Sequence, residues 1–96
     1  MKLIVENAAV EWFKNEINVK EGDAIRFFVR YGGSSPIQDG FSLAFYDEQP
    51  IDAGVFKIIE GINFFVEKED LWYFKEYDLV VDSDPVNDEL VFKYVQ

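Results

Sequence analysis

The sequence contains no cysteine and no histidine. A chain without these side chains cannot form a disulfide, hold structural zinc through thiolates and imidazoles, or ligate an iron–sulfur cluster through its own thiolates. It also lacks the side chain most often used for acid–base catalysis near neutral pH. Because no disulfide can form, the composition carries no sign of an oxidising compartment.

Positive charge is also scarce, with nine Lys and Arg against nineteen Asp and Glu and a formal net charge of −10. Contacts to phosphate groups need a basic surface, so this balance excludes nucleic acids and anionic lipid surfaces as partners. Such acidity is typical of a soluble protein. A basic protein partner or a hard cation is the alternative that it leaves open.

Long apolar runs are absent as well. Residues 1–5 do not contain the run of about 7–15 apolar residues found in a signal peptide. No stretch approaches the roughly 20 apolar residues that cross a bilayer. The sequence therefore predicts a cytoplasmic protein that has no membrane partner, and 96 residues predict one domain, residues 1–96.

Aromatic residues are abundant, with ten Phe, five Tyr and two Trp making up 18% of the chain. Each aromatic side chain buries about 150–250 Å² in a core. A core rich in these rings can stabilise a domain of this size without disulfides or a structural metal.

Alternation of apolar and polar residues predicts about seven short strands. They cover residues 2–5, 24–31, 41–45, 55–59, 62–66, 77–81 and 89–95. Apolar residues at helical spacing predict two short helices, residues 7–17 and 67–74, and a Gly turn at residues 60–61 joins two strands in a hairpin. Residues 32–40 are expected to form a loop. The predicted fold class is mainly β, of the α+β kind, with two small sheets packed face to face.

Four stretches, taken in order, resemble the HesB-like (A-type, IscA-like) family of iron–sulfur cluster carriers. They are residues 5–9 at the start of the first helix, residues 25–35 ending in Arg-Tyr-Gly-Gly-Ser-Ser, residues 61–67, and residues 71–82. The resemblance extends from about residue 3 to residue 94. It implies a HesB-like domain. Members of that family often self-associate, so it is compatible with a homodimer.

The sequence departs from that family at each position that would hold the cluster. The resemblance places the first ligand cysteine on Ser34, and the Cys-Gly-Cys that would follow the last strand is not present. A hydroxyl is much harder to deprotonate than a thiol, whose pKa is about 8.5, and is a poor donor for sulfide-bridged iron. We therefore expect no iron–sulfur cluster and no other cofactor.

These observations favour a non-catalytic accessory or interaction protein that contacts a protein partner in the iron–sulfur assembly machinery. The alternative is a carboxylate-based protein that binds iron or another divalent metal, with oxygen ligands from Ser34, Asp39 and the acids between residues 82 and 89. An enzyme is not expected, because Ser34 and Ser35 have no His and no Ser-x-x-Lys spacing to activate them.

The expected ligand or partner loop contains a small set of residues that follow one strand. They are Arg30, Gly32, Gly33, Ser34, Ser35 and Asp39. A plain turn between two strands is the alternative interpretation. Arg26 and Arg30 share one strand face, where they either pair with carboxylates across the sheet or hold a carboxylate or phosphate of a ligand.

Two further groups of residues are candidates for a site. The acids Asp82, Asp84, Asp88 and Glu89 are weak metal candidates, because the segment begins like a calcium loop but lacks the required Gly at the sixth position; a solvated acidic face is the alternative. Trp72 and Tyr73 lie in a run of four large apolar residues that one helix face cannot bury. They are candidates for a partner-binding patch, with partial packing in the core as the alternative.

Overall fold

The computed structural model describes residues 1–96 and contains seven strands, one α-helix and one 3₁₀ helix. In chain order these are β1 Leu3–Val5, α1 Asn7–Glu16, β2 Ala24–Ser34, β3 Asp39–Asp47, β4 Ala53–Ile59, β5 Ile62–Glu67, η1 Lys68–Phe74, β6 Asp78–Asp84 and β7 Glu89–Val95. The predicted α+β class, with two short helices, is confirmed. Neither helix is long and apolar enough to cross a membrane.

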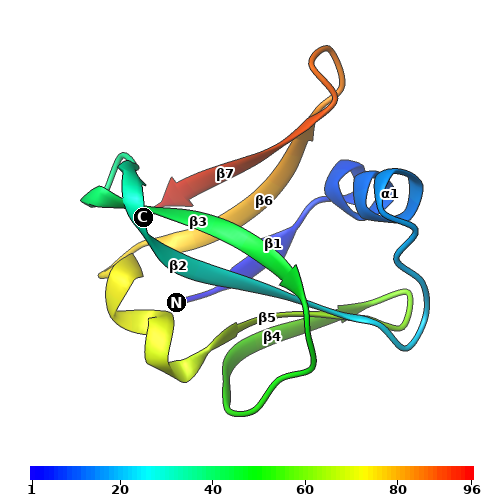
Figure 1. Cartoon of the computed structure of the whole chain (residues 1–96), viewed down its shortest axis with the longest axis horizontal. Helices are drawn as coiled ribbons and strands as arrows, with labels where there is room; N and C mark the ends of the chain where they lie inside the picture. The colour runs from blue at the N-terminus through cyan, green and yellow to red at the C-terminus, as the bar shows by residue number, and fades with distance from the viewer.

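The strands form two sheets that face each other, as predicted (Figure 1). One sheet has the order β1-β6-β7, and the other has the order β3-β2-β5-β4. Each sheet contains one parallel pair, β1 with β6 and β2 with β5, while the remaining pairs are antiparallel. Helix α1 lies at one end of the two sheets and η1 at the opposite end.

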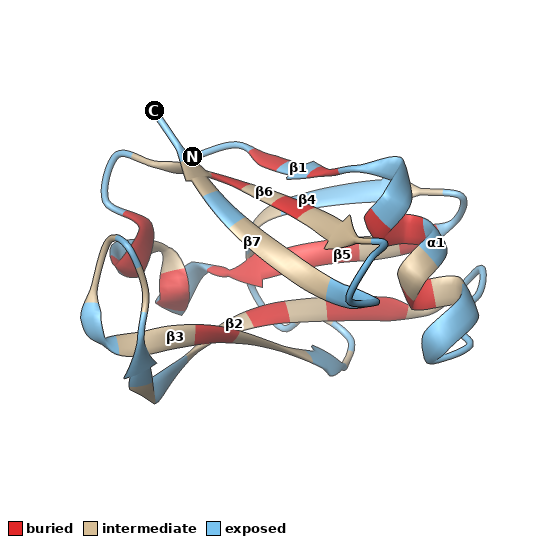
Figure 2. Ribbon diagram, turned by 90° about the horizontal axis from the view of Figure 1, so that it is seen from above, coloured by how far each residue is buried: buried red, intermediate tan, exposed pale blue.

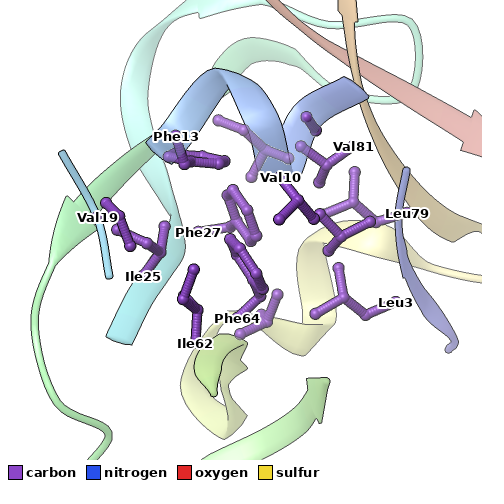
Figure 3. Close-up of a cluster of buried hydrophobic side chains, with 14 of the residues drawn as sticks. Leu3, Val10, Phe13, Val19, Ile25, Phe27, Ile62, Phe64, Leu79 and Val81 are labelled. Atoms are coloured by element: carbon purple, nitrogen blue, oxygen red, sulfur yellow. The ribbon is translucent and has the colours of Figure 1, made fainter. Parts of the chain in front are cut away.

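The core lies between the inner faces of the two sheets, where Figure 2 shows the buried segments of β2 and β5 opposite those of β1 and β6. Phe13 on α1 reaches into it, with its ring centre 6.1 Å from Phe27, 5.5 Å from Phe64 and 5.2 Å from Phe45 (Figure 3). No side chain caps the N-terminus of α1. The helix is therefore stabilised mainly by the packing of its apolar face, which is the usual case for a short helix.

The β4–β5 hairpin has the turn that the sequence predicts. Glu60 and Gly61 both have positive φ angles, 52° and 77°, as a two-residue type I′ turn requires. A Cβ atom at Gly61 would lie 2.5 Å from Cγ of Glu21, so the turn also packs too closely against the neighbouring segment for a larger residue.

The segment predicted as a loop at residues 32–40 is largely strand. Pairing of β2 with β3 is interrupted between Tyr31 and Ser34 but resumes where Ser34 faces Asp39. Gly32 and Gly33 adopt positive φ angles of 122° and 67°, which an irregularity of this kind favours. The Gly and Ser composition predicted a loop because it reports local freedom and carries no information about pairing with β3. Only residues 35–38 separate the two strands.

The acidic segment after residue 81 also differs from the prediction. It was expected to be a loop, but Asp82 and Asp84 belong to β6 and pair with Val91 and Glu89 of β7. Pairing of β6 with β1 ends at Val81, so this extension is paired only with β7, and a strand segment with one free edge tolerates charged residues.

The connection between β3 and β4, residues 48–52, crosses the outer face of the four-stranded sheet (Figure 1). It leaves β3 beside the start of β2 and enters β4 opposite Glu67, at the end of β5. The buried carboxylate of Glu67 accepts the backbone N–H groups of Ile51 at 3.1 Å and Asp52 at 3.2 Å. These hydrogen bonds hold the connection against the sheet.

Replacing Phe13 with Ala tests the contribution of the aromatic core. Removal of a fully buried Phe side chain leaves a cavity among the neighbouring rings and is expected to lower the free energy of unfolding by about 3–5 kcal/mol. Urea unfolding measures this as a lower midpoint. Val86→Ala, at an exposed position, is the matched control and should change the free energy by less than about 0.5 kcal/mol.

Candidate functional site

The Ser34 loop satisfies its own polar groups. The hydroxyl of Ser34 donates to Oδ1 of Asp39 at 3.0 Å, and the backbone N–H of Gln38 donates to Oγ of Ser35 at 3.1 Å. The one cavity of the molecule lies elsewhere. The loop therefore closes on itself in this structure.

Arg30 braces the irregular part of β2. Its Nε donates to Oγ of Ser42 at 3.0 Å, and the Ser42 hydroxyl donates to the carbonyl of Gly32 at 3.1 Å. A Cβ at Gly33 would lie 3.1 Å from the same hydroxyl oxygen. The structure thus brings together the loop residues that the sequence selected, in contacts that stabilise the hairpin. That they also bind a ligand or partner stays a prediction.

Tyr73 is buried, so its predicted place in an exposed patch is wrong. Its ring packs in edge-to-face geometry on Phe74, with centres 5.1 Å apart, and its hydroxyl lies 2.9 Å from the hydroxyl of Tyr94 on β7. Burial, reinforced by the hydrogen bond with Tyr73, raises the pKa of Tyr94 well above its usual range. Tyr73 is therefore a core residue that ties η1 to the last strand.

Trp72, the other member of that predicted patch, is 54% exposed. Its ring centre lies 5.3 Å from Phe41, and Phe41 lies 5.7 Å from Tyr31, its partner across β2 and β3. Tyr31 is 90% exposed. We call Tyr31, Phe41 and Trp72 the aromatic end surface, because they lie where the β2–β3 hairpin meets η1.

The sequence did not select Tyr31 and Phe41 as surface residues. Alternation places Tyr31 on the same strand face as Ile25, Phe27 and Val29, which predicts an inward side chain. Exposure nevertheless rises from the buried Phe27 to the exposed Tyr31, since the core ends before the strand does. The run of Gly and Ser residues that follows Tyr31 is the sequence feature that agrees with its exposure, because a strand end followed by such residues can project beyond the core.

Arg26 is paired with carboxylates, as one of its two interpretations predicted. Its guanidinium lies 2.9 Å from Glu69, 3.2 Å from Asp70 and 3.7 Å from Glu48. Burial raises the pKa of Asp70, and the positive charge of Arg26 opposes that shift. Arg30, in contrast, forms no ion pair and only hydrogen-bonds Ser42.

The acids near the β6–β7 turn do not form a metal site. Nowhere in the structure do three or more acidic side chains gather in a way that could hold a metal ion. The carboxylate of Asp84 instead accepts a hydrogen bond from the backbone N–H of Val86 at 2.9 Å. The carboxylate of Asp82 accepts one from Nζ of Lys93 at 3.1 Å. Asp88 faces Glu16 of α1, and a hydrogen bond between the two carboxyl groups raises the pKa of Glu16.

Comparison with known proteins identifies relatives along nearly the whole chain. It is 46% identical over 94 residues to a Bacillus subtilis (strain 168) protein named pyruvate dehydrogenase inhibitor, covering 98% of this chain and 99% of that protein. It is 38% identical over 96 residues to an uncharacterised Staphylococcus epidermidis protein, covering 97% and 98% of the two chains. An uncharacterised Staphylococcus saprophyticus protein is 36% identical over 95 residues, covering 96% and 97%.

No protein-family model matches the chain, and no solved structure matches it. The resemblance to the HesB-like iron–sulfur carriers is therefore wrong, because no family model matches and a relative matched along its full length is named a pyruvate dehydrogenase inhibitor. The accessory role in iron–sulfur assembly and the alternative role in metal binding fall with it. The four stretches were individually unspecific, since short strands joined by Gly and Ser turns occur in many small β domains.

The contacts of Asp84 predict a pH-dependent contribution to stability. Hydrogen bonds from the Val86 backbone and the Asn87 side chain lower the pKa of Asp84 below its ordinary value of 3.8. The folded chain then binds fewer protons here than the unfolded chain, so the stabilisation is present above that value and is lost as the pH falls below it. Asp84→Ala should lower the free energy of unfolding at neutral pH, with the difference from wild type shrinking from about pH 5 to pH 2. Denaturant unfolding at several pH values measures this, and a constant difference would contradict it.

Proposed function

This chain belongs to the same family as the Bacillus subtilis pyruvate dehydrogenase inhibitor, and from that premise we propose that it is a non-catalytic regulator that inhibits pyruvate dehydrogenase by direct contact. The observation that carries the proposal is 46% identity over 98% of the chain, with no domain-sized segment left unmatched. The absence of His and Cys agrees with a role that needs no catalytic group of its own.

The aromatic end surface is the part of the chain that we propose makes the contact. Tyr and Trp are common anchors at the centre of protein interfaces, because they bury much area with few rotatable bonds. Trp72 is half-exposed and Tyr31 almost fully exposed, so both rings have surface to bury on a partner.

The framework behind these rings favours binding. Tyr31 and Phe41 are paired across β2 and β3, and Trp72 is braced by contacts with Phe41 and the buried Tyr73. Rings that are already held in position lose little conformational freedom when a partner covers them. The inhibitor therefore needs no rearrangement of its own to present this surface.

The first test measures the activity of a purified pyruvate dehydrogenase complex, taken from the organism that encodes this chain, against increasing concentrations of the purified protein. Inhibition should be dose-dependent. The double variant Tyr31→Ser, Trp72→Ser should raise the half-inhibitory concentration at least about tenfold, since anchor residues each contribute about 2 kcal/mol or more.

Val86→Ser is the matched control, because Val86 is an exposed apolar residue in the β6–β7 turn, at the far end of the molecule from η1 (Figure 1). It should inhibit as wild type does. Absence of inhibition at a large molar excess would refute the proposed function. Equal inhibition by wild type and the double variant would keep the function but refute the proposed surface.

We also propose that the protein acts without a cofactor. The purified chain should contain far less than one equivalent of any transition metal by elemental analysis, and its inhibition should be unchanged by a chelator. Stoichiometric metal that is lost together with inhibition would contradict this.

A further inference from the structure

The outer face of the four-stranded sheet carries a continuous row of side chains. Register places Arg26 of β2 opposite both Tyr46 of β3 and Phe65 of β5, and Phe65 opposite Phe56 of β4. The row therefore extends across all the strands of this sheet on the side away from the core. Phe65, at its centre, is buried, although the other sheet does not cover it.

Two residues of this row and two apolar residues near it have most of their surface uncovered. Tyr46, Phe56 and Ile58 on the strands, together with Ile51 in the connection that crosses the face, are each more than half exposed. We call these four residues the outer apolar face. Several exposed apolar side chains on one face of a protein of this size commonly mark a site of interaction.

A cavity opens on the same face, between the crossing connection and η1. Its volume is about 140 Å³, and its lining residues are Arg26, Ile51, Asp52, Glu67 and Glu69. At roughly 30 Å³ per molecule of liquid water, it holds several waters. The ammonium group and last methylenes of one lysine would occupy a comparable space.

The charge around the cavity is predominantly negative. Arg26 is its only basic lining residue, and its guanidinium is already engaged by Glu69, Asp70 and Glu48. Asp52 and Glu67 form no ion pair; the carboxylate of Glu67 accepts only backbone N–H groups. The cavity therefore presents uncompensated negative charge beside apolar surface.

We propose that this face binds a basic, amphipathic segment of a protein partner. Apolar side chains of the segment pack on Tyr46, Phe56 and Ile58, and a Lys or Arg side chain enters the cavity beside Asp52 and Glu69. Charge complementarity selects this occupant: an acidic segment would meet like charges, and the carboxylates are too dispersed to hold a bare metal ion.

The apolar contacts supply most of the affinity, and the charges supply selectivity. An ion pair that stays partly in water contributes little to affinity, whereas burying a Leu-sized side chain contributes several times as much. This face is separate from the aromatic end surface, and the inference does not rest on the proposed inhibition of pyruvate dehydrogenase.

The test uses a soluble peptide of about ten residues, built from Ser and Gly with two Leu and two Lys, added to the isotope-labelled full chain. Chemical-shift changes should concentrate on the outer apolar face, with weak affinity that falls further at high salt, where the Debye length shortens from about 10 Å to about 3 Å. The same peptide with Glu in place of Lys should bind at least tenfold more weakly.

Two pairs of substitutions localise the site. Phe56→Ser with Ile58→Ser should weaken peptide binding at least tenfold, and Asp52→Asn with Glu69→Gln should weaken it severalfold and remove most of its salt dependence. Tyr31→Ser with Trp72→Ser, on the aromatic end surface, is the matched control and should leave peptide binding unchanged. The positions at residues 56 and 58 are exposed, and unfolding midpoints verify that each variant is folded.

The inference is overturned if the Lys peptide causes no shift changes at millimolar concentration, if the Glu peptide binds equally well, or if the shifts map to the aromatic end surface. Because this experiment contains no pyruvate dehydrogenase, its result is independent of the inhibition assay. A chain that binds the peptide but does not inhibit would refute only the proposed function, and the converse would refute only this inference.

Discussion

The packing of Phe13 among Phe27, Phe45 and Phe64 is the contact on which the rest of the domain depends. It joins α1 to three strands of one sheet, and a chain without cysteine has no disulfide to replace it. Aromatic rings fill this core efficiently because each buries a large area and pairs favourably edge to face. The remaining elements pack around this cluster, with η1 at the opposite end of the two sheets from α1.

The same abundance of rings explains why the molecule has two exposed apolar regions. The space between the sheets is filled by inward residues from β2, β5 and α1, so rings beyond its limits, such as Tyr31 and Phe56, remain in contact with water. A net charge of −10 keeps a surface of this kind soluble, because like-charged molecules repel one another. The acidic charge thus opposes the association that exposed aromatic rings would otherwise favour.

Much of the fold could be predicted from local pattern. Alternation located the strands, and Glu60 with Gly61 located a turn, because these depend on residues near one another in the chain. The continuation of β2 through Gly32 and Gly33 could not be predicted, since it depends on pairing with β3. The burial of Tyr73 depends on Tyr94, a residue distant in sequence. The candidate site could be predicted only in part for the same reason. The run of four large apolar residues predicts that Trp72 is exposed, whereas alternation places Tyr31 in the core, and its exposure depends on how far the opposing sheet extends.

The parallel pairing of β1 with β6 has a consequence for how the protein forms in the cell. The three-stranded sheet combines the first strand of the chain with the last two, so it cannot assemble on the ribosome until β6 and β7 have been synthesised. Until then the side chains of Phe27 and Phe64 are not covered by the three-stranded sheet. Folding is therefore completed only after β6 and β7 have been synthesised, and a nascent chain that stalls before β6 presents a bare aromatic sheet to chaperones and proteases.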